Sequence, residues 1–212
     1  MGNRGSLDTS VTLPAEDAQR YADSTHFTVD EVKALYIFFS SIAASNEDDG
    51  LIDRREFQQA LGFKDSVFLD RMFAVFDKDG DGMITYSEFV AGLSIFTTKA
   101  PAEEKLRFSF NVYDFDGDGA IATAELREML RATVYETDTL VVPEDQLEAL
   151  VEATMVQANP ATPGRISFEE YVNMVANHPN MLSQMTINIS SIIMENIGGL
   201  NLNSPAPPAA AS

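Results

Sequence analysis

Segment 77–88 carries four carboxylates at a spacing that suits a hard divalent cation. Aspartates stand at its first, third and fifth positions, a glycine at the sixth and a glutamate at the twelfth. Ca²⁺ takes six to eight oxygen ligands at about 2.3–2.6 Å, and such alternating carboxylates can converge on one ion where the glycine permits a sharp turn. The predicted ligands are Asp77, Asp79, Asp81, the backbone carbonyl of Met83, and both carboxylate oxygens of Glu88.

Segment 114–125 repeats this pattern. Its predicted ligands are Asp114, Asp116, Asp118, the backbone carbonyl of Ala120, and Glu125. The ninth position is Ala122, which has no side-chain oxygen, so water must supply that ligand. Four carboxylates around one point would repel one another strongly without a cation. Both segments are therefore predicted to bind Ca²⁺.

Two weaker copies of the pattern end at Glu56 and Glu170. For the first, a 12-residue frame begins at Ser45 and places Glu47 and Asp49 at the third and fifth positions. A longer frame begins at Ala43 and would use backbone carbonyls in place of the first side chains. The copy that ends at Glu170 has alanine and proline where the third and fifth ligands belong. It is predicted to have a structural role without binding Ca²⁺.

The elements that must position these loops follow from an internal repeat. A glycine, an isoleucine two residues later and a glutamate four residues further on recur four times, and apolar residues at helical spacing flank each copy. Thr28 and Glu31 form a predicted capping box at the start of the first helix. Four helix–loop–helix units are the EF-hand architecture, in which hands pair within lobes. The isoleucines are expected to pair the loops, Ile52 with Ile84 and Ile121 with Ile166.

The predicted fold class is all-α, with two EF-hand lobes of four hands in total and a C-terminal apolar helical segment. The expected division of the chain is a flexible N-terminal segment over 1–26, an N-terminal hand pair over 27–98, a C-terminal hand pair over 99–180, an apolar segment over 181–200 and a disordered Pro/Ala-rich tail over 201–212. A proline near the start of the third hand, Pro101, marks the boundary between the lobes.

Composition excludes several classes of function. The 212 residues include 33 acidic and 14 basic side chains, for a net charge of −19, so a nucleic-acid partner is not expected. The absence of cysteine excludes disulfides, cysteine-ligated zinc and thiol catalysis. Only two histidines occur, His26 and His178, and no nucleophile motif is present, so no enzymatic activity is predicted. No apolar run reaches the roughly 20 residues that span a bilayer.

The ends of the chain carry two further signals. Residues 1–6 fit the N-myristoylation pattern, with Gly2 as the acceptor. One myristoyl chain binds membranes weakly, and no second anchor is present, so a cytoplasmic protein with weak, reversible membrane association is predicted. Segment 181–200 carries an apolar run. It either covers a hydrophobic groove until a partner helix displaces it, or is a permanently docked helix.

Several stretches resemble the calcineurin B-like calcium sensors of plants and algae. They are Phe27–Val32 with Ala34–Tyr36, Asp48–Ile52 with Glu56–Gln58 and Ala60–Leu61, Ala100–Pro101 with Glu104–Lys105, and His178–Pro179 with Leu182 and Met185–Thr186. The resemblance implies a first loop two residues longer than usual, which favours the frame from Ala43, with Asp49 and Glu56 as its side-chain ligands. It also implies a partner, the helical regulatory motif of a Ser/Thr protein kinase, docked in a hydrophobic groove.

Two alternatives remain open. Residues 1–3, 105–108 and 165–170 are similar to calcineurin B itself, which implies the catalytic subunit of a protein phosphatase as the partner. The other alternative is a calcium buffer, which would bind the ion without opening a groove. The lipidation pattern, the two degenerate hands and the spare apolar segment favour a sensor.

Overall fold

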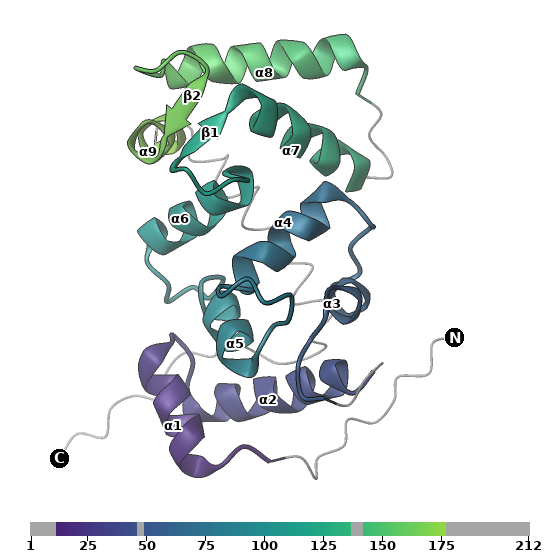
Figure 1. Cartoon of the computed structure of the whole chain (residues 1–212). Helices are drawn as coiled ribbons and strands as arrows, with labels where there is room; N and C mark the ends of the chain where they lie inside the picture. Colours follow the sequence, from purple (N-terminus) through teal and green to yellow (C-terminus); the bar gives the residue numbers. More distant parts are fainter. Residues whose placement is uncertain (1–11, 46–48, 137–141, 177–212) are drawn as a thin grey trace, which may run out of the picture.

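The computed structural model describes residues 12–45, 49–136 and 142–176, and this part of the chain is mainly helical (Figure 1). The elements are α1 (Ala15–Ser24), α2 (Val29–Ala43), α3 (Arg54–Leu61), α4 (Val67–Phe76), α5 (Tyr86–Ser94), α6 (Ala102–Tyr113), β1 (Ala120–Ala122), α7 (Thr123–Glu136), α8 (Glu144–Ala158), β2 (Arg165–Ser167) and α9 (Phe168–Ala176). The helices α2 to α9 form four successive helix–loop–helix units. The predicted all-α EF-hand fold is confirmed.

Local capping fixes where several of these helices begin. Thr28 accepts a hydrogen bond from the backbone N–H of Glu31, whose side chain accepts from the N–H of Thr28, so the predicted capping box at α2 is present. The starts of α3 and α5 have the same reciprocal arrangement, each with the last glutamate of its loop as the second partner. In these two hands, one glutamate therefore both caps a helix and stands at the twelfth loop position.

The loops pair as the isoleucine pattern predicts. Ile52 and Ile84 exchange two backbone hydrogen bonds, with N···O distances of 3.0 and 2.8 Å. In the second lobe, β1 pairs with β2 in antiparallel register, which places Ile121 opposite Ile166. The isoleucines are buried in both pairs, so they fix the register of each loop pair from the core side.

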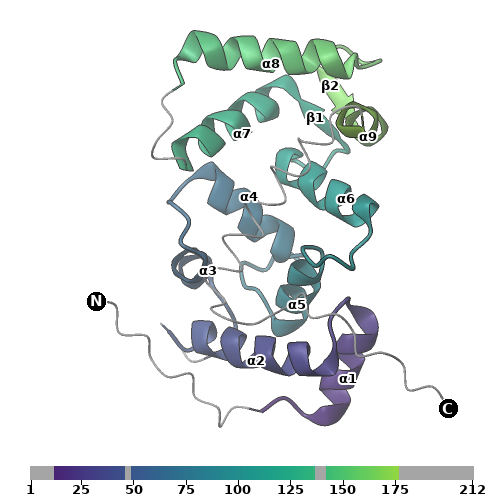
Figure 2. The ribbon, with the colours of Figure 1, turned by 180° about the vertical axis from the view of Figure 1, so that it is seen from behind.

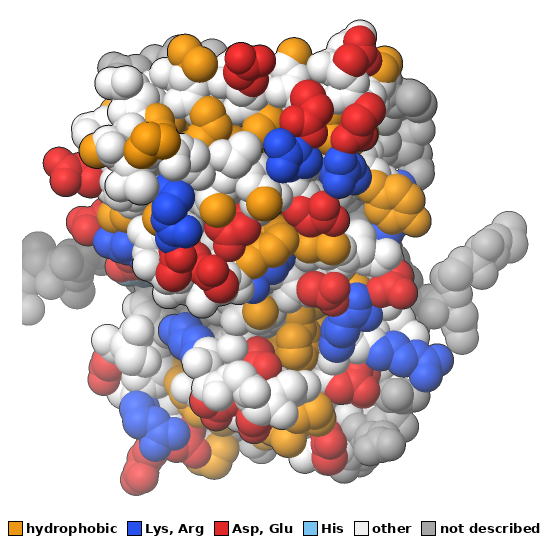
Figure 3. Space-filling model, turned by 45° about the horizontal axis from the view of Figure 1, so that its top comes forward, with side chains coloured by type: hydrophobic (Ala, Val, Ile, Leu, Met, Phe, Trp, Pro, Cys, Tyr) orange, Lys and Arg blue, Asp and Glu red, His pale blue; other side chains and the backbone are white. Residues whose placement is uncertain are grey.

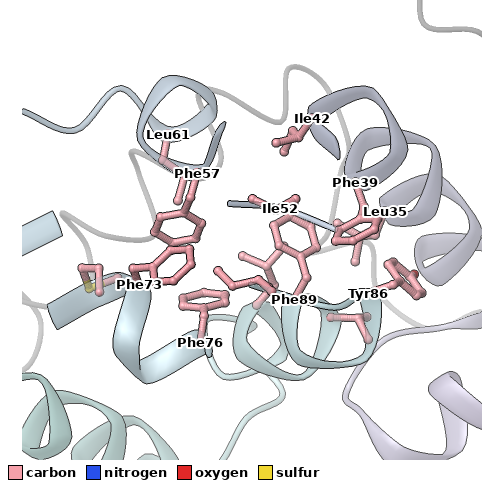
Figure 4. Packing of buried hydrophobic residues seen from close by; sticks show 14 of the residues in the cluster. Leu35, Phe39, Ile42, Ile52, Phe57, Leu61, Phe73, Phe76, Tyr86 and Phe89 are labelled. Atoms are coloured by element: carbon pink, nitrogen blue, oxygen red, sulfur yellow. The ribbon is translucent and has the colours of Figure 1, made fainter. Parts of the chain in front are cut away.

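The hydrophobic core of the first lobe extends into the second lobe, which also has a core cluster of its own. Helix α4 packs against both α6 and α7 in the middle of the molecule (Figures 1 and 2). Phe76 of α4 is fully buried among the rings of Phe57, Phe89 and Phe108, and the first two of these lie beside it in Figure 4. Phe108 belongs to α6, and Met129 of α7 is buried in the same cluster. A movement of α4 would therefore displace side chains of the second lobe that pack against it.

A glycine in α5 allows the close packing at Phe76. A β-carbon at Gly92 would lie 2.5 Å from Cε1 and 2.6 Å from Cδ1 of the Phe76 ring. Alanine is favoured over glycine in a helix by about 1 kcal/mol, but overpacking a filled core costs about 1–3 kcal/mol. We expect Gly92→Ala to lower the free energy of unfolding by up to about 2 kcal/mol, as measured by urea denaturation.

The control for this variant is the same change made in a Phe76→Leu background, where the smaller side chain leaves room for the new methyl group. There, Gly92→Ala should cost less or become stabilising. An equal cost in both backgrounds would contradict the steric explanation.

The N-terminal segment contains a helix that the prediction of flexibility over 1–26 missed. Helix α1 follows Pro14, has two acidic residues in its first turn and packs against α2 and α5. Its Ala18 is fully buried, and the Tyr21 ring meets Tyr86 edge-on at 5.1 Å between centroids. The described residues before Thr28 are therefore part of the folded N-terminal lobe.

Within residues 12–45, 49–136 and 142–176, every helix is too short or too polar to span a bilayer.

Candidate metal centres

The second loop brings its three aspartates together. Oxygen atoms of Asp77, Asp79 and Asp81 lie within 4.8 Å of one another. Backbone N–H groups orient two of these carboxylates, since Asp77 accepts from Gly80 and Gly82, both at 2.9 Å, and Asp81 accepts from Met83 at 2.8 Å. Gly82 has a φ of 88°, a left-handed conformation that a glycine adopts without strain. The turn thus aims the three carboxylates at one point.

Glu88, the fourth predicted carboxylate ligand, is not in this group and is bound instead to groups at both ends of the loop. Its Oε1 accepts from the N–H of Lys78 at 2.9 Å, and its Oε2 accepts from the N–H of Thr85 at 2.9 Å and from the Thr85 hydroxyl at 2.7 Å. Partial burial raises the pKa of the Glu88 carboxyl, but these hydrogen bonds together lower it by more, so its pKa stands below the ordinary value. The twelfth residue is therefore held as a carboxylate that faces both ends of the loop.

This geometry fits a calcium ion. Ligands on opposite sides of a Ca²⁺ ion are about 5 Å apart, because each metal–oxygen distance is about 2.3–2.6 Å. Oxygen atoms that lie within 4.8 Å of one another can therefore share one coordination sphere. The donors are carboxylates and carbonyls, which suit Ca²⁺ rather than zinc or copper.

The third loop has the same backbone but a different carboxylate cluster. Oxygen atoms of Asp114, Asp116 and Glu125 lie within 4.8 Å of one another. Asp118 is not in this group, and its Oδ2 accepts a hydrogen bond from the Arg165 guanidinium of β2. That contact lowers the pKa of the Asp118 carboxyl below its ordinary value. Both loops therefore bring three carboxylates together, but the third loop turns its fifth-position aspartate toward an arginine.

In the first hand, the fifth-position aspartate and the twelfth-position glutamate have hydrogen bonds like those in the second and third loops. The Oδ1 of Asp49 accepts from the N–H of Leu51 at 2.9 Å, as the fifth-position aspartates of the other two loops do with the residue two further on. Ser45 donates to Oε1 of Glu56 at 3.3 Å, which brings together the two ends of the 12-residue frame. Glu56 is only 2% exposed. Residues 46–48, which include Glu47, lie outside the described part of the chain.

The fourth loop is folded like the others but lacks ligands. Glu170 accepts from the N–H of Ala161 at 2.7 Å and from the N–H and hydroxyl of Ser167, both at 2.8 Å. Alanine and proline occupy the third and fifth positions. The glutamate thus closes the loop through hydrogen bonds alone.

We expect Glu170→Gln to leave the number of bound Ca²⁺ ions unchanged, because this loop offers too few oxygens to hold the ion. Calorimetric titration of the stripped protein would measure the number. A loss of one site in this variant would contradict a purely structural fourth hand.

Arg71 of α4 binds the backbone at the start of the third loop, and reasoning from the sequence missed it. It extends from α4 and donates four hydrogen bonds to backbone carbonyls at the end of α6 and the start of the third loop. The acceptors are Asn111 at 2.9 Å, Val112 at 3.3 Å, Asp114 at 2.8 Å and Phe115 at 3.0 Å. Its guanidinium also lies 5.0 Å from the ring centroid of Phe115. The one signal in the sequence is a basic residue within a mainly apolar helix.

Three further predicted features lie outside the described residues. They are the acyl-acceptor Gly2, the apolar segment 181–200 and the Pro/Ala-rich tail 201–212.

Two family models match the chain. The model of an EF-hand domain pair matches residues 103–176, and that of an EF hand domain matches residues 68–96. The first covers the third and fourth hands, and the second covers most of α4, the second loop and α5. EF-hand domains imply calcium binding, in agreement with the loop geometry.

Several curated proteins are similar over most of the chain. Calcineurin B of Naegleria gruberi is 32% identical over 178 residues, which are 84% of this chain and 97% of that protein. Calcineurin B of Schizosaccharomyces pombe is 34% identical over 77% of this chain and 90% of its own length. Calcineurin B-like protein 5 of Arabidopsis thaliana is 33% identical over 81% of this chain and 86% of its own.

Proposed function

Because this chain belongs to the family of calcineurin B and calcineurin B-like EF-hand proteins, we propose that it is a Ca²⁺ sensor that regulates a protein kinase or a protein phosphatase. Segments 77–88 and 114–125 each bind one Ca²⁺ ion through the carboxylates and carbonyls named above. In the first hand, Asp49 and Glu56 are the candidate side-chain ligands of a third site, since their hydrogen bonds to the loop backbone match those of the other loops. The protein itself has no catalytic role.

The observation that carries this proposal is the convergence of three carboxylates in each of two loops. These loops lie between helices that pack against one another, so ion binding and helix position are linked. When an ion draws the twelfth glutamate toward the aspartates, the helix that this residue caps must move with it. That link favours a sensor over a buffer, whose helices barely move.

Packing between the lobes can transmit such a helix movement from one lobe to the other. Helix α4 leads into the second loop and also contacts α6 and α7 of the other lobe. On the face shown in Figure 3, hydrophobic side chains lie in small groups among charged ones. The exposed large apolar residues of the described surface include Leu150 and Val156 of α8. Such scattered residues are usual on a protein surface and do not by themselves form a docking groove. In the proposed mechanism, Ca²⁺ binding opens the groove that receives the partner helix.

Two kinds of partner are consistent with this family. The first is the regulatory helix of a Ser/Thr protein kinase, which the similarity to a calcineurin B-like protein supports. The second is the catalytic subunit of a protein phosphatase. It is favoured by alignments that cover 90% or more of two calcineurin B proteins. Acylation of Gly2 would add weak, reversible membrane association, and the net charge of −19 argues against nucleic acid.

Calorimetric titration of Ca²⁺ into the stripped full-length protein tests the sensing role. We expect two or three sites, and fewer than two would contradict the proposal. Binding of a kinase regulatory peptide and of a phosphatase helix peptide is then compared with Ca²⁺ and with chelator. Ca²⁺-dependent binding of one peptide identifies the partner class, whereas Ca²⁺ binding without any gain in affinity for either peptide would indicate a buffer.

A further inference from the structure

The two calcium loops differ in the residue that faces them from the partner loop. In the second lobe, Arg165 of the fourth loop lies directly opposite Ala122, the ninth residue of the third loop. Side chains of directly opposed residues in an antiparallel pair lie on the same face. The ninth position of a calcium loop faces the ion, and Ala122 leaves that space open. A long side chain at position 165 can therefore reach the third calcium site.

The arginine makes this contact. Its Nη2 donates to Oδ2 of Asp118, with the two side chains 40% and 36% exposed. The hydrogen bond to Asp118 raises the pKa of the Arg165 guanidinium, and the charges of Asp116 and Glu125 raise it further. A positive charge thus stands among the carboxylates that the third loop offers to Ca²⁺.

The first lobe provides an internal comparison. Its loops pair through Ile52 and Ile84, as the other two pair through Ile166 and Ile121. The residue before Ile166 is Arg165, and the residue before Ile52 is Leu51. The second loop therefore faces a neutral side chain, and all three of its aspartates lie within one cluster. The third loop has the same aspartate spacing, but its fifth-position carboxylate, that of Asp118, is bound to the arginine.

We propose that Arg165 is an internal counter-cation that competes with Ca²⁺ for Asp118 and sets the affinity of the third loop below that of the second. This inference rests on the proposed function, since it requires both loops to bind Ca²⁺. When the ion enters the third loop, Asp118 exchanges the guanidinium for the metal, and the displaced charge stays nearby. The second loop fills first, and the third responds only at a higher Ca²⁺ concentration.

The size of the effect follows from the charges. A doubly charged ion about 6 Å from a guanidinium in a water-like dielectric has its binding constant lowered roughly tenfold. Because Arg165 is partly exposed, salt reduces this repulsion. The difference between the loops should therefore shrink as the ionic strength rises.

The test follows each loop separately in the full-length protein during a Ca²⁺ titration. The backbone N–H groups of Gly82 and Gly119 each donate to the first aspartate of their own loop, so their two-dimensional NMR signals report the two sites individually. In the wild type, the Gly82 signal should change at a lower Ca²⁺ concentration than the Gly119 signal. Arg165→Leu should move the Gly119 midpoint to a roughly tenfold lower Ca²⁺ concentration and leave the Gly82 midpoint in place.

The reciprocal variant, Leu51→Arg, brings the same charge to the second loop. It should raise the Gly82 midpoint by a similar factor without changing that of Gly119. It also keeps the proposal testable if Arg165→Leu fails to fold. The matched control is Arg131→Leu, which removes one positive charge from the same lobe. The partners of Arg131 are Glu128 and Glu144, not loop residues, so the midpoints should stay within about twofold of the wild type.

Thermal unfolding separates this role from a merely structural one. Arg165→Leu should lower the midpoint temperature of the stripped protein, because Asp118 loses its partner, and should increase the rise that Ca²⁺ produces. The proposal would be overturned if Arg165→Leu lowered the unfolding temperature equally with and without Ca²⁺. It would also be overturned if the Gly119 midpoint in the Ca²⁺ titration were unchanged or higher. A wild type in which neither glycine responds to Ca²⁺ would instead refute the proposed function.

Discussion

Replacing Glu125 with glutamine is expected to lower the Ca²⁺ affinity of the third loop by more than about 100-fold, since loss of even an indirect contact to a metal ligand costs about 10–100-fold. A calcium loop relies on its twelfth residue for two oxygens of the coordination sphere and for one negative charge. Glutamine removes the charge and replaces one oxygen with an NH₂ group, which cannot be a ligand. Glu88→Gln should have the same effect on the second loop.

The fold of the loop should survive this change. The Glu125 carboxylate accepts from the N–H groups of Phe115 and Ala122, both at 2.7 Å, and the remaining amide oxygen can keep one of these bonds. Each variant should therefore lose one site in a calorimetric titration, while the glycine signal of the other loop still responds. Glu170→Gln is the matched control, because the same chemical change is made in the loop without ligands. Retention of both sites in Glu125→Gln would contradict the assignment of the third loop.

Replacing Arg71 with methionine is expected to destabilise the protein by about 2–4 kcal/mol, because hydrogen bonds to a charged group contribute about 1.5–3 kcal/mol each and are not additive. The four carbonyls that Arg71 binds belong to the last turn of α6 and to the first residues of the third loop. The last carbonyls of a helix have no partner within it, and a cation at that end also offsets the helix dipole. Methionine fills similar space but satisfies none of these groups.

The same change should weaken Ca²⁺ binding in the third loop, since Asp114 is both a predicted ligand and one of the residues that Arg71 holds in place. Arg71→Lys is the informative comparison. It keeps a positive charge, but one ammonium group cannot span four carbonyls, so it should recover only part of the stability. Urea denaturation and the Gly119 midpoint measure the two effects. Wild-type stability in Arg71→Lys would show that charge alone matters at this site.

Arg71 also gives the coupling between the lobes a structural basis. It extends from the helix that leads into the second loop and binds the start of the third loop. Together with the contact between Phe76 and Phe108, this contact joins the two lobes, so that a movement of one is expected to displace the other. If Ca²⁺ binding in the second loop moves α4, Arg71 carries that movement to the third loop, whereas the proposed role of Arg165 is to lower the Ca²⁺ affinity of the third loop. The two arginines would then have opposite effects on the same site.

Sequence patterns alone were enough to predict the loops in which carboxylates converge, the helices around them and the pairing of the loops. These features follow from local spacing. Carboxylates at alternate positions, a glycine that permits a left-handed turn and a capping glutamate act over a dozen residues, and one buried isoleucine in each loop sets the register of each pair. The absence of ligands in the fourth loop could be predicted for the same reason, since each ligand position can be checked by residue type.

The distant residues that act on the loops became visible only in the folded chain. Arg165 reaches Asp118 across 47 residues of sequence, and Arg71 reaches Phe115 across 44. Neither contact follows from a local pattern, because a long arginine side chain can choose among many carboxylates and carbonyls until packing fixes its position. Helix α1 is stable for a similar reason, since its buried Ala18 and its Tyr21 gain their contacts from α2 and α5. Local spacing thus specifies the two loops in which carboxylates converge, whereas long-range packing places Arg165 and Arg71 beside the third of the four loops.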